Sequence, residues 1–331
     1  MTEEAALARI VLNAMRADFE STAVSMAEDV LVTPLLPLHS ASGPRIHLKA
    51  ENLQPFGSFK VRAGIAALAA TAPDALARGV VTASAGNFAQ GLAFAAQRRN
   101  VKLTVHVPET AAAVKVAAIE ELGASIIRHP FDRWWQIMRT RATGDDRATF
   151  VHPVCEPAVI IGNGTIGLEL LQQCARFDTV FVPFGGGGLV CGIAHALRCS
   201  GWQGKVVACE VETSTPLASA FAQGRPVTVE RRASFIDGIG STSVLEEMWP
   251  LLRRLVDDVV VVSLPEASAA LRRLALENHL IVEGAGAVAL AAALRSDSSG
   301  GAAIAVLSGG NIDASRFHDV LKETASGGGA T

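Results

Sequence analysis

The chain lacks several features that would indicate a particular class of protein. Its formal net charge is −3 and no block of basic residues occurs, so nothing indicates binding to nucleic acid or to a membrane surface. No run of about 18 or more apolar residues occurs, so the sequence predicts no transmembrane helix. The chain has 331 residues, 50% of them hydrophobic, and we expect it to bury a large core and to divide into two domains.

Cysteine is also scarce, and its pattern disfavours both a disulfide framework and a C-x-x-C motif. The five cysteines are odd in number, and no C-x-x-C pair occurs among them. Most have apolar neighbours, so we expect small buried side chains in a protein of the reducing cytoplasm. The eight histidines show no spacing typical of a metal site, and no metal is assigned. The cysteines are Cys155, Cys174, Cys191, Cys199 and Cys209.

Lysine is scarce as well, with six among the 29 lysines and arginines. One of them, Lys60, ends the string ENLQPFGSFK, in which a Pro/Gly turn and a serine precede the expected start of a helix. The primary amine of a lysine can form a Schiff base with an aldehyde cofactor. A lysine held at the start of a helix in this way therefore indicates such a role. Taken alone, Lys60 is better explained as a solvated helix residue.

A run of four glycines, Gly185, Gly186, Gly187 and Gly188, follows the expected strand Thr179–Pro183 and precedes an expected helix. Such a loop directs several backbone N–H groups at one anion in front of a helix N-terminus, which predicts a phosphate site. A rival interpretation is a dinucleotide site with Glu210 on the ribose, but the third glycine is displaced to Gly192 and G-x-G-x-x-G is not satisfied.

Two more loops follow expected strands. In TASAGNFAQG, Ser84, Gly86 and Asn87 offer hydrogen-bond donors for a substrate carboxylate, although serine and asparagine also favour N-capping turns. In LSGGNID, the hydroxyl of Ser308 can donate to a ring nitrogen, and the glycines allow a flat ring to approach. Each loop alone is equally compatible with an ordinary turn.

Strand and helix patterns alternate along nearly the whole chain, which predicts an α/β fold with parallel twisted sheets flanked by helices. We expect a large domain from residues 1–76 and 151–331, a small domain from residues 77–150, and a disordered tail over 325–331. The expected strands are Ile46–Ala50, Val80–Ala83, Leu103–Val107, Ser125–Arg128, Thr149–His152, Thr179–Pro183, Lys205–Val211, Val259–Ser263 and Ala302–Leu307. The expected helices are Phe88–Arg98, Ala112–Leu122, Gly164–Ala175, Leu189–Cys199, Glu266–Glu277 and Ala287–Leu294, besides one in the first twenty residues.

Several strings, taken together and in order, resemble the fold-type II pyridoxal-phosphate enzymes, specifically the serine/threonine dehydratase and serine racemase group. The resemblance implies a tryptophan-synthase-β-like fold and pyridoxal 5'-phosphate as cofactor. It runs from about residue 32 to 313 through ENLQPFGSFKVRAG, TASAGNFAQG, FVHPVCEPAVIIGNGTIGLE, VPFGGGGLVCGIA, VEGAGAVALAAAL and LSGGNID.

The resemblance also implies a role for each candidate site residue. Lys60 is expected to be the Schiff-base lysine and the base at Cα. The implied cofactor contacts are Phe59 beside the cofactor, Gly185 to Gly188 on the phosphate, Asn87 on the ring hydroxyl and Ser308 on the pyridine nitrogen. The implied substrate contacts are Ser84, Ala85, Gly86, Asn87 and Phe88. The family's divalent-cation site is unassigned here, because no aspartate follows Glu210 at the expected distance.

The expected activity is that of an ammonia-lyase, a dehydratase that removes water from serine, threonine or a bulkier β-hydroxy amino acid. We expect a cytoplasmic homodimer that acts on a small molecule. Ala85 stands where racemases of the group carry a serine, which favours elimination over racemisation, and Phe56 and Phe88 favour the bulkier substrate. The alternatives are a racemase, a β-replacement synthase, a nicotinamide-dependent oxidoreductase or a catalytically silent sensor.

Overall fold

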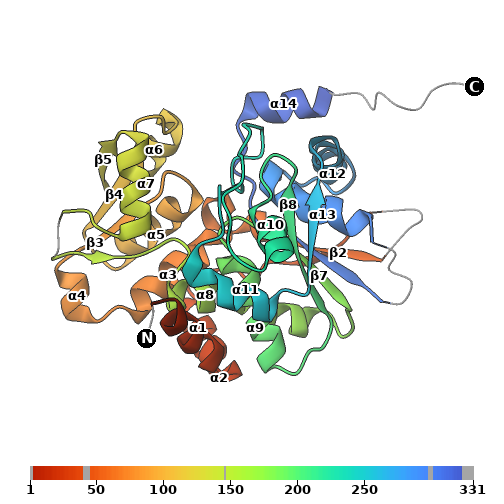
Figure 1. The fold of residues 1–331 in the computed structure, drawn as a ribbon, viewed down its shortest axis with the longest axis horizontal. Helices are drawn as coiled ribbons and strands as arrows, with labels where there is room; N and C mark the ends of the chain where they lie inside the picture. The colour runs from red at the N-terminus through yellow and green to blue at the C-terminus, as the bar shows by residue number, and fades with distance from the viewer. Residues whose placement is uncertain (1–2, 40–44, 145–146, 297–300, 323–331) are drawn as a thin grey trace, which may run out of the picture.

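Two β-sheets covered by helices make up the chain (Figure 1), so the predicted α/β fold is confirmed. The computed structural model describes residues 3–39, 45–144, 147–296 and 301–322. The larger sheet has the order β1-β2-β10-β7-β8-β9, and only β1 runs antiparallel to its neighbour. Its strands are β1 (Leu35–Pro37), β2 (Ile46–Lys49), β7 (Thr179–Pro183), β8 (Lys205–Val211), β9 (Asp258–Val262) and β10 (Ala303–Val306).

Helices bury both faces of the larger sheet, as its apolar strands require. Along β7, Val180 and Val182 belong to the core beneath α8 and α9, whereas Phe181 belongs to the core beneath α12 and α13. This alternation follows from the two-residue period of a strand. The helices around this sheet are α1 (Glu3–Asn13), α2 (Arg16–Met26), α8 (Pro157–Gln173), α9 (Gly188–Cys199), α10 (Pro216–Gln223), α11 (Trp249–Leu255), α12 (Leu264–Glu277), α13 (Gly284–Leu294) and α14 (Ala314–Lys322).

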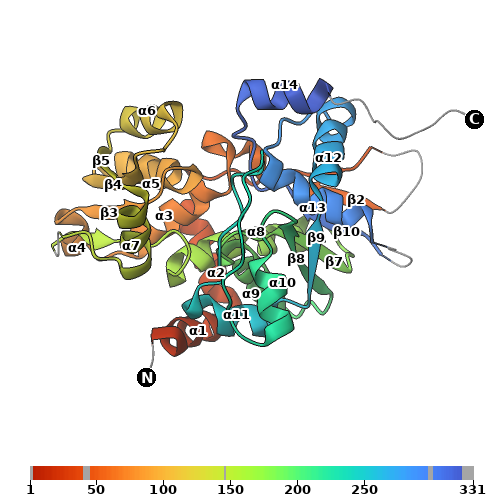
Figure 2. The same ribbon diagram turned by 45° about the horizontal axis from the view of Figure 1, so that its top comes forward.

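The smaller sheet is parallel throughout and has the order β5-β4-β3-β6. Figure 2 labels its strands β5, β4 and β3. All its strands fall between residues 80 and 150, but its core also includes Val61, Ile65 and Leu68 from the earlier helix α3. The domain limits remain a prediction. The elements of this part are α3 (Lys60–Ala70), α4 (Pro73–Ala77), β3 (Val80–Ala83), α5 (Asn87–Arg98), β4 (Leu103–Pro108), α6 (Ala113–Glu121), β5 (Ser125–His129), α7 (Phe131–Thr140) and β6 (Thr149–Phe150).

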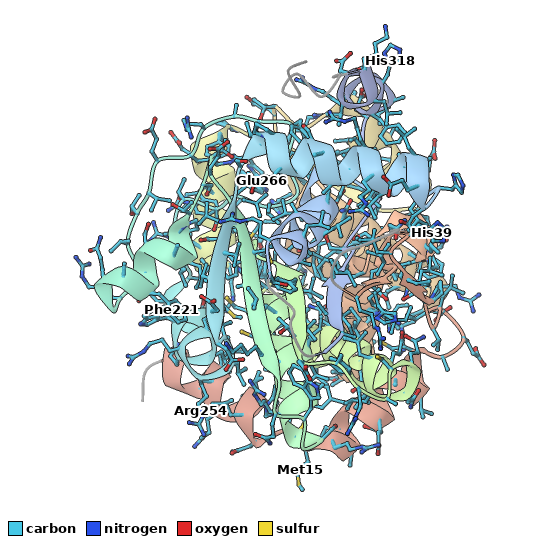
Figure 3. All side chains as sticks on the ribbon, turned by 90° about the vertical axis from the view of Figure 1, so that its right-hand side faces the viewer. Met15, His39, Phe221, Arg254, Glu266 and His318 are labelled. Atoms are coloured by element: carbon cyan, nitrogen blue, oxygen red, sulfur yellow. The ribbon has the colours of Figure 1, made fainter. Side chains whose placement is uncertain are left out.

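Most of the expected elements appear within a few residues of their predicted limits, but several differences are larger, and the helices α4, α10, α11 and α14 were not among those expected. Helix α8 begins at Pro157, well before the expected Gly164, and the short strand β1 was not expected. The single helix predicted for the first twenty residues is two helices, because the Asp18 carboxylate accepts the N–H of Met15 at 2.7 Å and caps α2. Met15, at this break, is 69% exposed, and Figure 3 shows its side chain projecting from the lower edge of the molecule. The predicted disorder of residues 325–331 lies outside the described residues.

Among the described helices, none combines the length and the apolar composition that crossing a bilayer requires.

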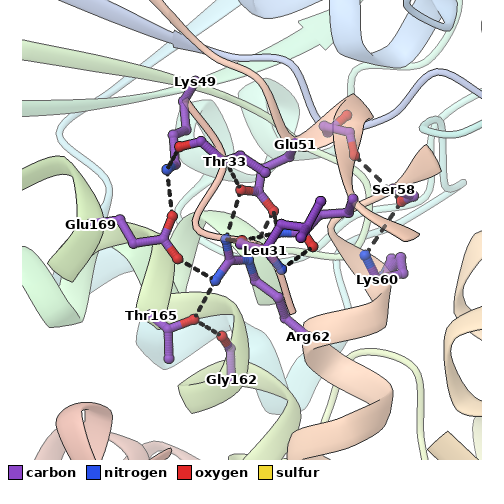
Figure 4. A network of polar contacts seen from close by, with 12 residues as sticks. Leu31, Thr33, Lys49, Glu51, Ser58, Lys60, Arg62, Gly162, Thr165 and Glu169 are labelled. Carbon is purple, nitrogen blue, oxygen red and sulfur yellow. Dashed lines mark hydrogen bonds and ion pairs between the residues drawn. The ribbon is translucent and has the colours of Figure 1, made fainter. Parts of the chain in front are cut away.

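A buried network of ion pairs joins α3 to the larger sheet and to α8 (Figure 4). The guanidinium of Arg62 is 1% exposed and donates to both oxygens of Glu51, at 2.8 and 2.9 Å, and to Glu169 at 2.7 Å. Lys49 donates to the second oxygen of Glu169 and, at 2.7 Å, to the backbone carbonyl of Thr33. Since each buried charge has an opposite charge beside it, removing one member exposes the others to an uncompensated cost of burial.

We expect Arg62→Met to lower the free energy of unfolding by about 3–5 kcal/mol, because the carboxylates of Glu51 and Glu169 lose their shared cation. Urea denaturation measures this change. Arg16→Met is the matched control, because its pair with Glu20 is about half exposed, and it should cost about 1 kcal/mol or less. Equal losses in the two variants would contradict the importance of the buried network.

Candidate active site

The chain turns sharply before Lys60 and places this residue at the first position of α3. Phe56 and Gly57 have left-handed backbones, with φ of 59° and 66°, in the one-turn helix η2 (Pro55–Gly57). The hydroxyl of Ser58 then accepts the N–H of Lys60 at 3.3 Å. These contacts fix the direction in which the lysine side chain leaves the helix, as the sequence pattern around it predicts.

The turn before Lys60 is hydrogen-bonded to the loop that follows β10. The N–H of Phe59 donates to the carbonyl of Ser308 at 3.1 Å, and the N–H of Gly310 donates to the carbonyl of Gly57 at 2.8 Å. Two motifs that are 250 residues apart in the chain are thereby joined at the backbone. Ser308 therefore lies beside the lysine that the sequence assigns to the same cofactor.

Helix α3 also crosses α5 very closely, at Gly64 and Gly91. A Cβ atom at Gly64 would lie 2.6 Å from the carbonyl oxygen of Gly91, and one at Gly91 would lie 2.6 Å from the carbonyl oxygen of Lys60. Since real Cβ contacts are essentially never this short, only glycine fits at both positions. The crossing thus sets the distance of Lys60 from α5, whose first residues belong to the predicted substrate loop.

A cavity of about 240 Å³ lies between the two sheets and collects nearly all of the predicted site residues. Lys60 lines this cavity together with residues of three loops: the Ser84–Phe88 loop, the Gly185–Gly188 cup and the loop that contains Ser308. The predicted residues that line it are Phe59, Lys60, Ser84, Gly86, Asn87, Phe88, Gly185, Gly186, Gly187, Gly188 and Ser308. Residues that the sequence did not assign to the site also line it: Lys115, Pro153, Val154, Pro183, Leu189, Asp237, Gly238, Ile239 and Glu283.

Two residues that the sequence singled out lie outside the lining of the cavity. Ala85 does not line the cavity, and its side chain packs against the core of the smaller sheet. Phe56 also lies away from the cavity, and its ring packs on Phe94 with the ring centroids 5.1 Å apart. Because the left-handed turn rotates Phe56 outward, it gives no support to a bulkier substrate. Phe88 does line the cavity.

The four glycines form a cup of backbone N–H groups in front of α9. Within the described part of the chain, the N–H groups of Gly185, Gly186 and Gly187 have no hydrogen-bond acceptor. Gly187 has φ of 96°, and a Cβ atom at Gly186 would lie 2.5 Å from a methyl carbon of Val154. An anion at this helix N-terminus would receive these N–H groups and the favourable end of the helix dipole.

Glu283 is the main residue of the site that the sequence did not predict. It is 6% exposed, and its carboxylate accepts from the side-chain amide of Asn87 at 3.2 and 3.3 Å. Burial raises the pKa of Glu283 to about 7, against the lowering effect of the Asn87 amide. In the sequence, its signal is a single acidic residue at the start of the small-residue run EGAGAVALAAAL.

The amine of Lys60 lies in a poorly solvated setting. It is 3.5 Å from the carbonyl oxygen of Pro153, and 5.0 and 5.7 Å from the ring centroids of Phe59 and Phe88. Burial lowers its pKa from 10.5 to about 8, although the nearby Glu283 carboxylate partly opposes this shift. A substantial fraction of the amine is therefore neutral, and so nucleophilic, close to physiological pH.

Glu210 does not fit the rival dinucleotide interpretation. It ends β8 with 1% exposure, and its carboxylate accepts the N–H groups of Leu217 and Ala218 at 2.7 and 2.9 Å. It therefore caps α10 and does not line the cavity. No cluster of three or more potential metal ligands occurs among the residues that the structure describes.

The chemistry of the cavity fits pyridoxal phosphate. A phosphate suits the free N–H groups of Gly185 to Gly187, an aldehyde suits the neutral amine of Lys60, and a hydroxyl-bearing pyridine suits Ser308 and Asn87. The sequence model of the family described as "Pyridoxal-phosphate dependent enzyme" matches residues 26–309. The chain belongs to this family. Within it, the chain falls among the fold-type II enzymes related to threonine dehydratase and serine racemase, as the sequence predicted.

Similar proteins include both lyases and racemases. The chain is 38% identical to an L-threonine ammonia-lyase of Geobacter sulfurreducens over 88% of this chain and 74% of that protein. It is 34% identical to human serine racemase over 90% and 91%. Among solved structures, maize serine racemase superposes with a TM-score of 0.86 at 29% identity, covering 93% of this chain and 97% of that chain. The processed form of threonine deaminase isoform 2 from Solanum lycopersicum gives a TM-score of 0.84 at 29% identity, covering 93% and 94%.

The lowered pKa predicts how Lys60 reacts. After a brief exposure of the cofactor-free protein to pyridoxal phosphate and reduction with borohydride, peptide mapping should find the label on Lys60. Because only the neutral amine reacts, labelling should rise with pH to a plateau with a midpoint near 8. The exposed Lys205 serves as the internal reference. Labelling of Lys60 that continued to rise through pH 10 would contradict the effect of burial on its pKa.

Proposed function

We propose that the protein is an ammonia-lyase that eliminates water from serine or threonine and yields a 2-oxo acid and ammonia. The observation that carries this proposal is that Lys60 and the Gly185–Gly188 cup line the same cavity. The similarity to an L-threonine ammonia-lyase over most of both chains supports the same reaction class. With Phe56 outside the cavity, only Phe88 remains of the two residues that favoured a bulkier substrate, and we propose a substrate with a short side chain.

The residues of the cavity would hold the cofactor from several sides. Gly185 to Gly188 would receive the phosphate, Lys60 would bond to the aldehyde carbon in the absence of a substrate, Ser308 would donate to the ring nitrogen and Asn87 would meet the ring hydroxyl. When bound, pyridoxal phosphate withdraws electrons from the Cα atom of an amino acid and so makes the α-proton removable. Ser308 is neutral, and therefore does not force a proton onto the ring as a carboxylate would.

Once the amino group of the substrate has taken the place of Lys60 at the aldehyde carbon, the freed amine of Lys60 would serve as the base of the elimination. A pKa of about 8 leaves enough neutral amine at physiological pH to accept the α-proton, and the protonated form remains acidic enough to release it again. The α-hydrogen and the β-hydroxyl leave together as water. The enamine that remains takes up water and releases ammonia, which leaves a 2-oxo acid.

Glu283 and Asn87 hold one face of the site in a fixed arrangement. The amide of Asn87 donates to Glu283, while the amide of Asn311 donates at 2.9 Å to the oxygen of Asn87. The pKa of Glu283 is about 7, so its carboxyl group can gain and lose a proton near neutral pH. This exchange does not require a further cation beside the carboxyl group. We propose that it keeps the ring hydroxyl and its neighbours correctly protonated.

Serine racemase is the second candidate function, since the human enzyme matches nearly the whole chain. Racemisation needs a proton donor on the face of Cα opposite Lys60, and Ala85 has no proton to give at the position where racemases carry a serine. We therefore propose elimination without racemisation. We also propose, from the sequence, a cytoplasmic homodimer.

The proposal predicts that the wild-type protein releases 2-oxo acid and ammonia from L-threonine or L-serine and forms no D-serine. Lys60→Ala should lower kcat by about 10²–10⁴-fold, because the base is lost. A coupled assay for the oxo acid and chiral chromatography of the remaining serine measure both results. Lys102→Ala, at an exposed lysine, should retain full activity. Undiminished activity of Lys60→Ala, or rapid formation of D-serine, would contradict the proposal.

A further inference from the structure

One buried side chain near the glycine cup has no hydrogen-bond partner and no part in the chemistry above. Asn163, within α8, is 0% exposed, and neither its amide nitrogen nor its amide oxygen is hydrogen-bonded within the described part of the chain. Buried side-chain amides are nearly always hydrogen-bonded, because a polar group buried without a partner has a cost that an apolar group does not have. The burial of this amide therefore points to a bound group as its partner.

The close packing of α8 on α9 brings Asn163 to the start of α9. The two helices cross where Gly164 meets Gly192, and a Cβ atom at Gly192 would lie 2.8 Å from the backbone nitrogen of Gly164. Helix α9 begins at Gly188, the last residue of the glycine cup. A Cβ atom at Gly188 would lie 3.6 Å from the amide nitrogen of Asn163 and 3.5 Å from the carbonyl oxygen of Val154. Asn163 thus lies directly behind the cup.

The space between the cup and this amide stays open because residue 188 is a glycine. Separations of 3.5 and 3.6 Å are ordinary van der Waals contacts, so the point that a Cβ atom of Gly188 would occupy is free of other parts of the chain. At Gly186, by contrast, a Cβ atom would collide with a methyl carbon of Val154 at 2.5 Å. The amide of Asn163 can therefore approach an anion in the cup past Gly188.

We propose that the amide of Asn163 completes the phosphate site and donates a hydrogen bond to the phosphate of the cofactor past Gly188. The N–H groups of the cup and this amide then hold one anion from two helices, α9 and α8. A neutral amide suits this buried position, because a lysine or arginine there would be an unpaired charge whenever the cofactor is absent. The proposal concerns the binding of the cofactor, so its test is independent of the ammonia-lyase function.

Replacing the amide by an apolar group of the same shape tests this role. Asn163→Leu should weaken the binding of pyridoxal phosphate to the cofactor-free full chain by about tenfold, the effect of losing one hydrogen bond to a charged group. The binding of pyridoxal, which has the same ring and aldehyde but no phosphate, should stay unchanged. Titration followed by the visible absorbance of the bound compound measures both affinities.

The same variant should melt at a higher temperature than the wild-type protein when both are free of cofactor. The reason is that leucine removes a buried amide that has no partner until the phosphate binds. Ser200→Ala is the matched control, because the hydroxyl of Ser200 is also buried without a partner among the described residues but lies at the opposite end of α9. This control should leave both affinities unchanged.

Gly188→Ala provides a second test, because a methyl group fits at this position and fills the space beside the amide. In a Gly188→Ala background, Asn163→Leu should therefore cause no further loss of affinity for pyridoxal phosphate. Additive losses in the double variant would overturn the proposal. So would an equal loss of affinity for both compounds in Asn163→Leu, or a lower melting temperature, since either indicates a structural role. Unchanged affinity for both compounds would overturn it as well.

Discussion

The close packing of helices at glycine positions is the constraint on which the site depends. Helix α3 meets α5 at Gly64 and Gly91, and on its other side it meets α8 at Gly162, where a Cβ atom would lie 2.9 Å from the carbonyl oxygen of Arg62. Helix α8 in turn leaves no room for a side chain at Gly192 of α9. Since α3 begins at Lys60 and α9 begins at the glycine cup, this packing sets the distance between the amine and the phosphate site.

The charges around α3 serve two different purposes. On one side of the helix, Arg62 joins two buried carboxylates in a network in which every charge is compensated, and this network holds the helix. On the other side, Lys60 and Glu283 lie in a cavity where burial is less fully compensated, so that the amine and the carboxyl have pKa values of about 8 and about 7. The first arrangement is suited to stability and the second to proton transfer near neutral pH.

Much of the fold and of the site could be predicted from the sequence, because strands, turns and glycine loops leave local signals. The limits of β7 and β8 were predicted correctly, and every assigned site position except Ala85 lines the cavity. The predicted start of α8 was too late in the chain, because Gly162 and Gly164 locally resemble a loop. Tertiary packing requires both glycines within the helix. Lys115 and Glu283 were missed as site residues because the contacts that bring them to the cavity are long-range.

A crystal structure of the protein grown with pyridoxal phosphate tests the central claim most directly. The account predicts continuous electron density from the Nζ atom of Lys60 to the aldehyde carbon, with the phosphate within hydrogen-bond distance of the N–H groups of Gly185 to Gly188. A cofactor bound elsewhere, or joined to any other lysine, would contradict it.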